Sequence, residues 1–417
     1  MATIVITSSG TLGDHLPYVA LGQALKARGH RVRMAISRPM HSYAVNAGLE
    51  AVACGCDMGQ EEAQKYSQDW DHWSPKGSSL QEKLLKFQKF DIPGRFRDIL
   101  AACQDADLLI SNPMQAFPAA MVCEKTAIPL VVAFMSVLSI KPLTEISKPT
   151  INQPTPLEER LDEDLQKLRE EAGLVKRPRP WSEGRHTLKA DQIIVAISPH
   201  FFSEKSALSY NMTGFWFYED QAWSNWQPSQ QLQEFFQQDQ EPLVLAFSSQ
   251  PLKNPREVVE VHVRAAANLG RPILIQHGWA GFSEDHLPAD IDRTRVMFAG
   301  FLPQDWLFAR AAAVIHHGGI GTTARALRHG CPMLVEPYGN DQFINAKQVL
   351  LLGVGAAAHP HKLNEAGLVQ ILQEKVLTPE YRRRAEEIGE KIQQEQGLIT
   401  ACDLIESSLS TKTSVRH

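Results

Sequence analysis

Residues 316–323 read HHGGIGTT, so three glycines, two histidines and two threonines fall within eight positions. The apolar run 311–315 precedes them and a helix-like stretch, 324–329, follows, which predicts a strand, a tight turn and a helix start. Unpaired N–H groups at a helix start, together with the helix dipole, favour a bound anion. The glycines allow close approach, while His317 and the threonines offer donors. An ordinary turn needs fewer such groups, so the segment predicts a phosphate site.

A second glycine-rich turn, residues 8–17, places Asp14 and His15 at the mouth of the first predicted strand. Gly10 and Gly13 resemble only half of a dinucleotide fingerprint, so a dehydrogenase is poorly supported. Asp14 could cap the following helix, or serve as a general base if its carboxylate faces the cleft, and the residues alone favour neither role. His15 is a rival base, because its unperturbed pKa suits that role better.

Three more groups follow predicted strands in the second half of the chain. The ring of Phe301, close to Gln304, could stack on a nucleobase, although a core position is the usual one for such a ring. Asp341 and Gln342 supply the acceptors and donors that sugar hydroxyls need, with a polar turn as the alternative. Ser249 is a candidate for a second phosphate contact, or a simple strand-end turn.

The composition limits the class of protein. With 417 residues, 43% apolar and 21% charged, the chain predicts a soluble globular protein of two domains. A net charge of −5 and the lack of a dense Lys/Arg cluster argue against nucleic-acid binding and against anionic lipid. The six scattered cysteines predict neither a disulfide framework nor a structural metal. No apolar run reaches about 18 residues and no leader pattern is present, so we expect a cytoplasmic protein.

Apolar runs alternate with helical periodicity in both halves, which indicates βαβ units and mostly parallel sheets. The runs are 3–7, 31–36, 107–111, 129–134 and 192–197 in the first half, and 242–247, 272–276, 294–298, 313–316 and 333–336 in the second. We therefore expect two doubly wound α/β domains that face each other across a cleft, where open α/β sheets place their ligands.

Residues 57–95 and 141–188 do not follow this rhythm. The second stretch contains leucines that fall on one side of a helix, which predicts a helix packed on its own domain. This leucine stripe consists of Leu157, Leu161, Leu165 and Leu168. A lid or a membrane-surface helix is the less favoured interpretation, because the polar face is more acidic than basic. Residues 379–409 predict one long charged helix.

Taken in order, these motifs resemble the nucleotide-sugar-dependent glycosyltransferases of the GT-B fold, in the branch of sterol and lipid glucosyltransferases and bacterial macrolide and glycopeptide-antibiotic glycosyltransferases. GTLGDHLPYVALGQALKARGH, at 10–30, is similar to the opening motif of that branch. The donor-half motifs are PQDWLF (303–308), HHGGIGTTARALRHGCP (316–332) and PYGNDQ (337–342). Matched segments at both ends, in the same order, span most of the chain.

The resemblance implies an inverting transfer of a hexose, with glucose favoured, from a UDP- or dTDP-sugar to a hydroxyl of a hydrophobic small molecule or lipid. No cofactor is implied besides the nucleotide sugar, nor a metal or nucleic acid, while a transient membrane-surface contact is left open. The implied parts are an acceptor-binding Rossmann-like domain (1–220), a linker (221–240), a nucleotide-sugar-binding Rossmann-like domain (241–385), and a C-terminal helix and tail (386–417), for which packing back on the first domain is one option.

The resemblance also assigns roles to residues. Asp14 matches the general-base position, whereas the register of His15 does not match it. The donor positions are a pyrophosphate clamp of His317 with the amides of Gly319, Gly321 and Thr322, sugar contacts at Asp341 and Gln342, a base-stacking region at Phe301 and Gln304, and a second phosphate contact at Ser249. Candidates for apolar acceptor surface are Phe87, Phe90, Phe134 and Met135.

Four positions depart from the plant-type pattern of the family. Asp14 replaces the usual His, and Asn112 stands where those enzymes carry the Asp that orients that His, so these two departures agree with each other. Ser248 replaces a glycine of the phosphate loop. Arg325 occupies the place of the Glu that usually binds ribose. Two rival functions therefore stay open, a GT-B-fold nucleotide-sugar epimerase and a non-catalytic nucleotide-sugar-binding protein.

Overall fold

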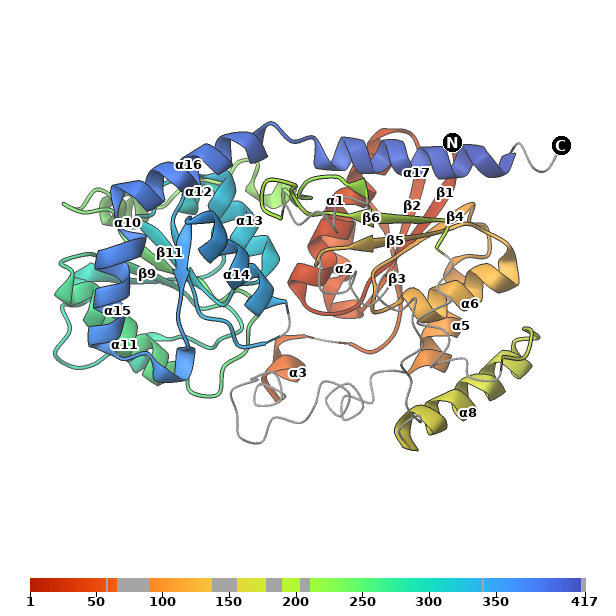
Figure 1. The fold of residues 1–417 in the computed structure, drawn as a ribbon, viewed down its shortest axis with the longest axis horizontal. Helices are drawn as coiled ribbons and strands as arrows, with labels where there is room; N and C mark the ends of the chain where they lie inside the picture. The colour runs from red at the N-terminus through yellow and green to blue at the C-terminus, as the bar shows by residue number, and fades with distance from the viewer. Residues whose placement is uncertain are drawn as a thin grey trace.

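The structure, a computed structural model, describes residues 1–57, 59–65, 91–136, 156–177, 190–202, 211–339 and 341–413. In this part of the chain, two parallel sheets lie beside each other and are packed against helices (Figure 1). The predicted class, two doubly wound α/β domains, is confirmed.

The first sheet has seven strands in the order β3-β2-β1-β4-β5-β6-β7. They are β1 (Thr3–Thr7), β2 (Arg31–Ile36), β3 (Glu50–Ala53), β4 (Leu108–Ser111), β5 (Leu130–Phe134), β6 (Gln192–Val195) and β7 (Asn211–Met212). The helices on this side of the molecule are α1 (Leu12–Ala27), α2 (His41–Asn46), α3 (Gln60–Lys65), α5 (Ile92–Ala102), α6 (Ala116–Thr126), α8 (Pro156–Glu171) and α17 (Gly397–Thr413).

The second sheet has six strands in the order β10-β9-β8-β11-β12-β13. They are β8 (Leu243–Leu245), β9 (Ile273–Gln276), β10 (Val296–Ala299), β11 (Ala313–His316), β12 (Met333–Val335) and β13 (Gly355–Ala357). Its helices are α10 (Gln230–Phe236), α11 (Pro255–Asn268), α12 (Gln304–Phe308), α13 (Ile320–Arg328), α14 (Gln342–Leu352), α15 (Glu365–Ile371) and α16 (Pro379–Gln393), with a π-helical turn at Leu372–Val376.

Burial explains why the central strands are short apolar runs rather than alternating ones. The side chains of Ile4, Val5 and Ile6 are all 0% exposed, as are those of Val314 and Ile315 in the second sheet. Helices cover a parallel sheet on both faces, so consecutive side chains in the middle of a central strand are apolar. Val5 pairs in register with Arg33 and Leu109, which places β1 at the centre of the first sheet.

Strand order reverses at the same place in both sheets. In the first sheet β1 lies between β2 and β4, and in the second β8 lies between β9 and β11. Loops after two neighbouring strands then diverge to opposite faces and leave a crevice at their carboxyl ends, which is where open α/β sheets bind ligands. Asp14 lies in the first turn of the helix after β1, and the loops that follow β8 and β11 contain Ser249 and His317, respectively.

The chain crosses between the domains twice, and the two crossings touch. The first follows β7 and includes Gly214 and Trp216, whose ring packs edge-on against Tyr18 of α1. The second lies between α16 and α17, where Glu395 accepts a hydrogen bond from Ser198 (2.5 Å). Helix α17 then lies along the first domain, beside α1 (Figure 1).

Two expected boundaries differ from the structure. Residues 221–240, expected as a linker, contain α10 and pack on the second domain, because Trp226 and Phe236 both stack edge-on against Trp306 of α12. The long helix expected over 379–409 is two helices, since the chain must turn at 394–396 to return to the first domain. Residues 386–393 therefore belong to α16, on the second domain.

Tertiary context decides the elements that the sequence did not reveal. Strand β3 is short and begins with a charge, and Glu50 is held at the sheet edge by Arg31 and Arg33. Strand β13 is Gly-Ala-Ala, which has little intrinsic preference for a strand.

The leucine stripe does form a helix, α8, in which Leu165 and Leu168 are buried on the first domain. In the part of the chain that is described, none of the helices has the length and apolarity needed to span a bilayer.

The contact between the crossings yields a stability prediction. A Cβ on Gly397 would lie 2.5 Å from the carbonyl oxygen of Phe215, which is backbone and cannot turn away. Gly397→Ala should therefore lower the free energy of unfolding by about 1–3 kcal/mol, measured by urea denaturation. Gly300→Ala is the matched control, because no atom lies within 4 Å of its Cβ position. Equal stability of the two variants would contradict the contact.

Candidate functional site

Helix α13 begins earlier than the sequence predicted, with Gly319 as its N-cap residue and Ile320 as its first helical residue. The amide of Thr323 is the first to bond back, to the carbonyl of Gly319 (3.0 Å). The amides of Ile320, Gly321 and Thr322 therefore precede the hydrogen-bond ladder of the helix, as at any helix start. The hydroxyl of Thr323 is committed to the same carbonyl (2.9 Å). We call these amides, with His317, the cradle.

His317 lies folded over the start of α13. A Cβ on Gly319 would meet its Nε2 at 2.4 Å, so only glycine admits the ring there. The side chain is 7% exposed, and its Nδ1 has no hydrogen-bond partner among the described residues. Burial lowers the pKa of His317 to about 4. At neutral pH the ring is uncharged, so it can offer the cradle an N–H dipole rather than a cation.

Asp14 lies in the first turn of α1, which starts at Leu12. The N-cap residue is Thr11, and Asp14 is the third helical residue of a capping box. Its Oδ2 accepts from the amide (2.8 Å) and the hydroxyl (3.3 Å) of Thr11. Burial raises the pKa of Asp14 despite these hydrogen bonds. Asp14 is thus part of the cap, but both bonds use one oxygen.

The loops of the two domains meet at this point. The hydroxyl of Ser249, after β8, donates to that of Thr11, after β1, over 3.2 Å. Burial, and then the negative charge of Asp14, raise the pKa of Asp341 to about 6. A carboxylate from each domain therefore shares one desolvated region, which the sequence could place only by resemblance.

Asp341 is the N-cap residue of α14, and its partner on the next turn is Asn345. The amide group of Asn345 donates to Oδ2 of Asp341 (3.3 Å) and to the carbonyl of Gly318 (2.9 Å). This side chain therefore joins the Asp341 position to the cradle. Residues 341 and 345 are four apart on a helix, a spacing that could have revealed the pair.

Gln342 is buried and already engaged. Its Oε1 accepts from the amides of Tyr338 (2.7 Å) and Gly339 (3.0 Å), and its Nε2 donates to Oε1 of Gln250 (2.8 Å). Gln250 in turn donates to the carbonyl of Pro251 (3.0 Å). The structure thus gives Gln342 a loop-fixing set of contacts in addition to the sugar contact predicted from the sequence. Gln250 carried no motif that could have identified it.

His15, the rival base, is 1% exposed. Its Nδ1 lies 2.7 Å from the hydroxyl of Ser8, and Nε2 has no hydrogen-bond partner in the described part of the chain. Burial lowers the pKa of His15 to about 4. Asn112 does not orient Asp14 and instead donates to the carbonyl of Ser9 (2.8 Å), so it holds the β1–α1 loop.

Ser248 adopts the left-handed backbone conformation, with φ of 48°. Its carbonyl accepts from the amide of Trp279 (2.7 Å). The conformation is one that glycine adopts without a Cβ penalty, which explains why a glycine is usual at this position of the family's loop. Ser248 keeps the glycine-like turn that presents Ser249 to Thr11.

Arg325 is bound to protein rather than left available to a nucleotide. Its guanidinium contacts Asp305 of α12 and the carbonyl of Tyr218 in the first crossing, and its Cζ lies 5.5 Å from the ring centre of Phe217. Burial alone would raise the pKa of Asp305, but the hydrogen bond from His329 and the charge of Arg325 hold it well below its usual range. Arg325 therefore joins α13 to α12 and to the first crossing between the domains.

The other predicted residues within the described part of the chain make no hydrogen bond to the cradle. Phe301 follows β10 and is 43% exposed, and Gln304 is the first residue of α12. Phe134 ends β5 but is 1% exposed in the core, while Met135 after it is partly buried. Phe87 and Phe90 lie outside the described residues.

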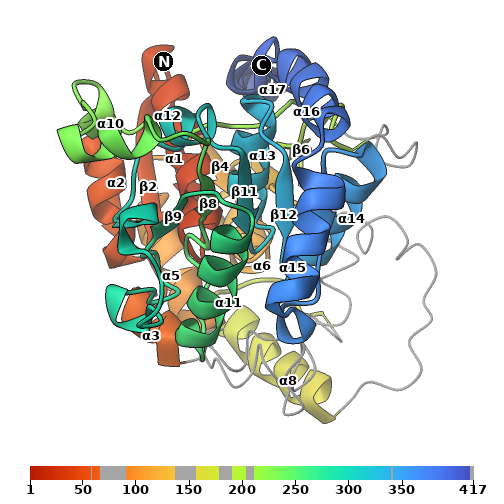
Figure 2. The same cartoon turned by 90° about the vertical axis from the view of Figure 1, so that its left-hand side faces the viewer.

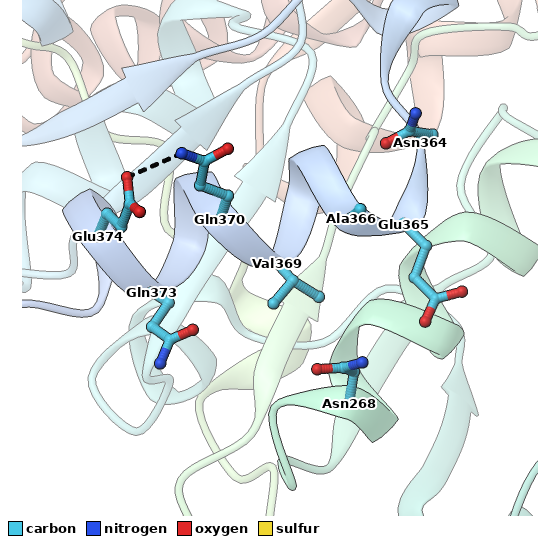
Figure 3. Close-up of a pocket in the computed structure, with 8 residues that line it drawn as sticks. All are labelled: Asn268, Asn364, Glu365, Ala366, Val369, Gln370, Gln373 and Glu374. Atoms are coloured by element: carbon cyan, nitrogen blue, oxygen red, sulfur yellow. Dashed lines mark hydrogen bonds between the residues drawn. The ribbon is translucent and has the colours of Figure 1, made fainter.

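A pocket of about 520 Å³ lies elsewhere on the second domain (Figure 3). Its lining residues come from α11 and from α15 with the turns beside it, two helices that lie side by side in Figure 2. Its lining is mainly amide and carboxylate side chains, and Gln370 donates to Glu374 across 3.1 Å on one turn of the helical rim. It shares no residue with the cradle or with the Asp14 loop, so we do not connect it with the site.

Solved structures identify the fold. The chain superposes on the glycosyltransferase of kitacinnamycin with a TM-score of 0.74 and 19% identity, covering 98% of this chain and 99% of that one. It superposes on CalG4, the calicheamicin glycosyltransferase, with a TM-score of 0.74 and 18% identity, covering 98% of each chain. The chain has the GT-B fold of these glycosyltransferases.

Sequence relatives narrow the class. Residues 274–396 match the family described as Erythromycin biosynthesis protein CIII-like, C-terminal domain. The chain is 28% identical to a sterol 3-beta-glucosyltransferase of Arabidopsis thaliana, over 95% of this chain and 64% of that protein. It is 25% identical to that of Debaryomyces hansenii, over 95% of this chain and 26% of that protein. It is 28% identical to O-mycaminosyltylonolide 6-deoxyallosyltransferase of Streptomyces fradiae, over 99% of this chain and 98% of that protein.

These matches confirm the resemblance stated from the motifs. The chain carries an EryCIII-like C-terminal domain and is a homologue of sterol glucosyltransferases and of a macrolide glycosyltransferase. It spans 64% or less of the length of the two sterol glucosyltransferases described above.

The paired carboxylates yield a pH prediction. The folded-state pKa of Asp341 is raised from 3.8 to about 6, so the folded protein holds a proton that the unfolded chain releases. Its contribution to stability is present below about pH 4 and is lost as the pH rises through about 6. Asp341→Asn should flatten this fall and make the protein more stable at pH 7.5, on the order of 2 kcal/mol in urea denaturation. An unchanged pH profile would show that the pKa of Asp341 is not raised in the folded protein.

Proposed function

We propose that this chain is an inverting glycosyltransferase that moves a hexose, with glucose favoured, from a UDP- or dTDP-sugar to a hydroxyl of a hydrophobic small molecule or lipid. The observation that carries the proposal is the meeting of the two loops at Ser249 and Thr11, which puts Asp14 of one domain opposite Asp341 of the other. An anion seat, a sugar-binding carboxylate and a candidate base then belong to one site.

The relatives support the same chemistry. Proteins homologous over nearly the whole chain are named for the transfer of glucose to a sterol and of a deoxyallosyl group to a macrolide. A further structure with this fold, SsfS6 of Streptomyces sp. SF2575, is complexed with thymidine diphosphate. A nucleoside diphosphate is the leaving group that the cradle would receive.

In the proposed reaction, the diphosphate of the donor rests on the amides at the start of α13 and receives a hydrogen bond from neutral His317. An acceptor hydroxyl donates to Asp14 and attacks the anomeric carbon. As the new carbon–oxygen bond forms, the bond to the diphosphate breaks, its electron pair leaves with the phosphate, and Asp14 takes the hydroxyl proton. One displacement from the opposite face inverts the anomeric centre. The developing charge falls on groups that are already oriented, which is the usual source of rate enhancement.

Asp14 suits the role of base better than His15. The hydrogen bonds to Asp14 both use Oδ2, so Oδ1 remains for the acceptor. Desolvation raises the pKa of Asp14, which makes the carboxylate a stronger base. His15 is enclosed, and Nδ1 is occupied by Ser8. We assign His15 to the support of the β1–α1 loop.

The proposal requires no cofactor besides the nucleotide sugar, because amides and an imidazole N–H receive the diphosphate charge. It retains the cytoplasmic location expected from the sequence and leaves open the transient membrane-surface contact. Phe301 and Gln304 are proposed to contact the nucleobase, and Met135 the acceptor.

The test is a transfer assay. The protein is incubated with UDP-glucose or dTDP-glucose and a panel of sterols, macrolide aglycones and lipid alcohols, and glycosylated products are detected by mass spectrometry. A product with inverted anomeric configuration supports the proposal. Donor isomerisation without acceptor would instead indicate an epimerase, and binding of both donors with no product across the panel would indicate a sugar-nucleotide-binding protein.

The role of Asp14 yields a sharper prediction. Asp14→Asn keeps the capping acceptor but removes the base, so transfer should fall by about 10²–10⁴-fold. Affinity for UDP or dTDP, measured by calorimetry, should change less than about twofold, because the cradle belongs to the other domain. His15→Gln is the matched comparison on the next residue and should retain most of the activity. Full activity of Asp14→Asn would remove this residue from the mechanism.

A further inference from the structure

A buried ion pair lies at the root of the loop that carries Asp341. Glu336 is the first residue after β12, and His262 lies on α11; the two side chains are each 2% exposed. His262 Nε2 and Glu336 Oε1 are 2.8 Å apart. Neither residue belongs to the motifs of the donor half, and neither touches the cradle.

The hydrogen-bond geometry fixes where the protons lie. His262 Nδ1 is 2.7 Å from the carbonyl oxygen of Val258, which can only accept, so Nδ1 carries a hydrogen. One further proton then lies between Nε2 and the Glu336 carboxyl group. Burial alone would lower the pKa of His262, but the charge and hydrogen bond of Glu336 outweigh it and the pKa is raised. The pair is therefore an imidazolium–carboxylate contact.

The side chains around this ion pair are apolar. Val259 and Val263, its neighbours on α11, are 0% and 1% exposed and belong to an apolar cluster with Leu334 of β12. Two apolar side chains of similar volume would be at least as stable in such a place. A directional pair in an apolar cluster is better suited to fixing geometry than to adding stability.

The geometry that it fixes is that of the loop from Glu336 to Gln342. The amide of Glu336 donates to the carbonyl of His316, at the strand end before the cradle (2.8 Å). The far end of the loop is held by Gln342, which binds Gln250 in the segment before α11. Both ends of the loop are thus anchored to the same structural unit, α11 with its preceding segment.

We infer that His262 and Glu336 are positioning residues, whose buried contact sets the place of Asp341 against the donor sugar. The inference rests on the proposed function, in which Asp341 binds sugar hydroxyls while the cradle binds the diphosphate. It follows that the pair governs recognition of the sugar and not of the nucleotide.

The test compares the affinities of His262→Leu for UDP-glucose and for UDP by calorimetry, with dTDP-glucose and dTDP in parallel. A loop displaced by about 1 Å should weaken nucleotide-sugar binding about tenfold, whereas nucleoside diphosphate binding should stay within about twofold. Val259→Ala, one turn earlier on α11, is the matched core control and should leave both affinities unchanged. Combining His262→Leu with Asp341→Ala should weaken sugar recognition no further than Asp341→Ala alone, because the pair acts through that residue.

The other outcomes are decisive as well. The double variant His262→Gln and Glu336→Gln retains a neutral hydrogen bond and should restore most of the discrimination; this variant and Glu336→Gln also serve if His262→Leu does not fold. Equal weakening of sugar nucleotide and nucleotide, or a lowered melting temperature with both affinities intact, would overturn the inference. Wild-type protein that binds neither UDP-glucose nor dTDP-glucose would instead refute the proposed function.

Discussion

The reversal of strand order at the centre of each sheet is the constraint on which the site depends. Because β1 and β8 each lie between strands whose connections run to opposite faces, the loops after them are left at an open crevice. The strand order reverses at β1 in the first sheet and at β8 in the second. The Ser249–Thr11 hydrogen bond shows that the segments after these two strands face each other. The donor and acceptor groups therefore come from different domains without any long excursion of the chain.

Desolvation is the second consequence of bringing these loops together. Asp14 and Asp341 would each ionise readily in water, but burial raises the pKa of both, and the charge of Asp14 raises that of Asp341 further. Sugar and acceptor hydroxyls placed between them would satisfy both groups. Ionisation of these two carboxylates is therefore less costly when hydroxyl groups of a ligand lie between them.

The sequence was sufficient for the fold class, for most of the central strands and for the two glycine-rich turns, because burial on both faces and helix starts leave strong local patterns. It offered Asp14 as a helix cap but did not identify Thr11 as the N-cap residue, since the capping box of Thr11 and Asp14 is set by side-chain geometry that periodicity does not report. It also predicted a linker at 221–240. There, Trp226 and Phe236 pack on Trp306, which is distant in the sequence, and this contact holds the segment against the second domain.

Contacts within the site were harder to foresee. Gln342 binds Gln250, 92 positions away, and no local motif encodes this contact. Arg325 binds Asp305 on another helix and Tyr218, 107 positions away, and these contacts have no local motif either. Asn345, by contrast, is one helical turn from Asp341 and was within reach of spacing alone. Roles that depend on a residue's own backbone turn were predictable, whereas roles that depend on a distant partner were not.

The path of the chain has a consequence for how this protein is made. Helix α17, residues 397–413, packs beside α1 and is held by Arg28, which contacts Asp403 and Glu406. The second domain is thus topologically inserted into the first. On the ribosome, the complete second domain emerges before the first can be closed by its final helix, so the order of maturation reverses the order of the sequence. A truncation that spares every residue of the site would still leave the acceptor-side domain unfinished.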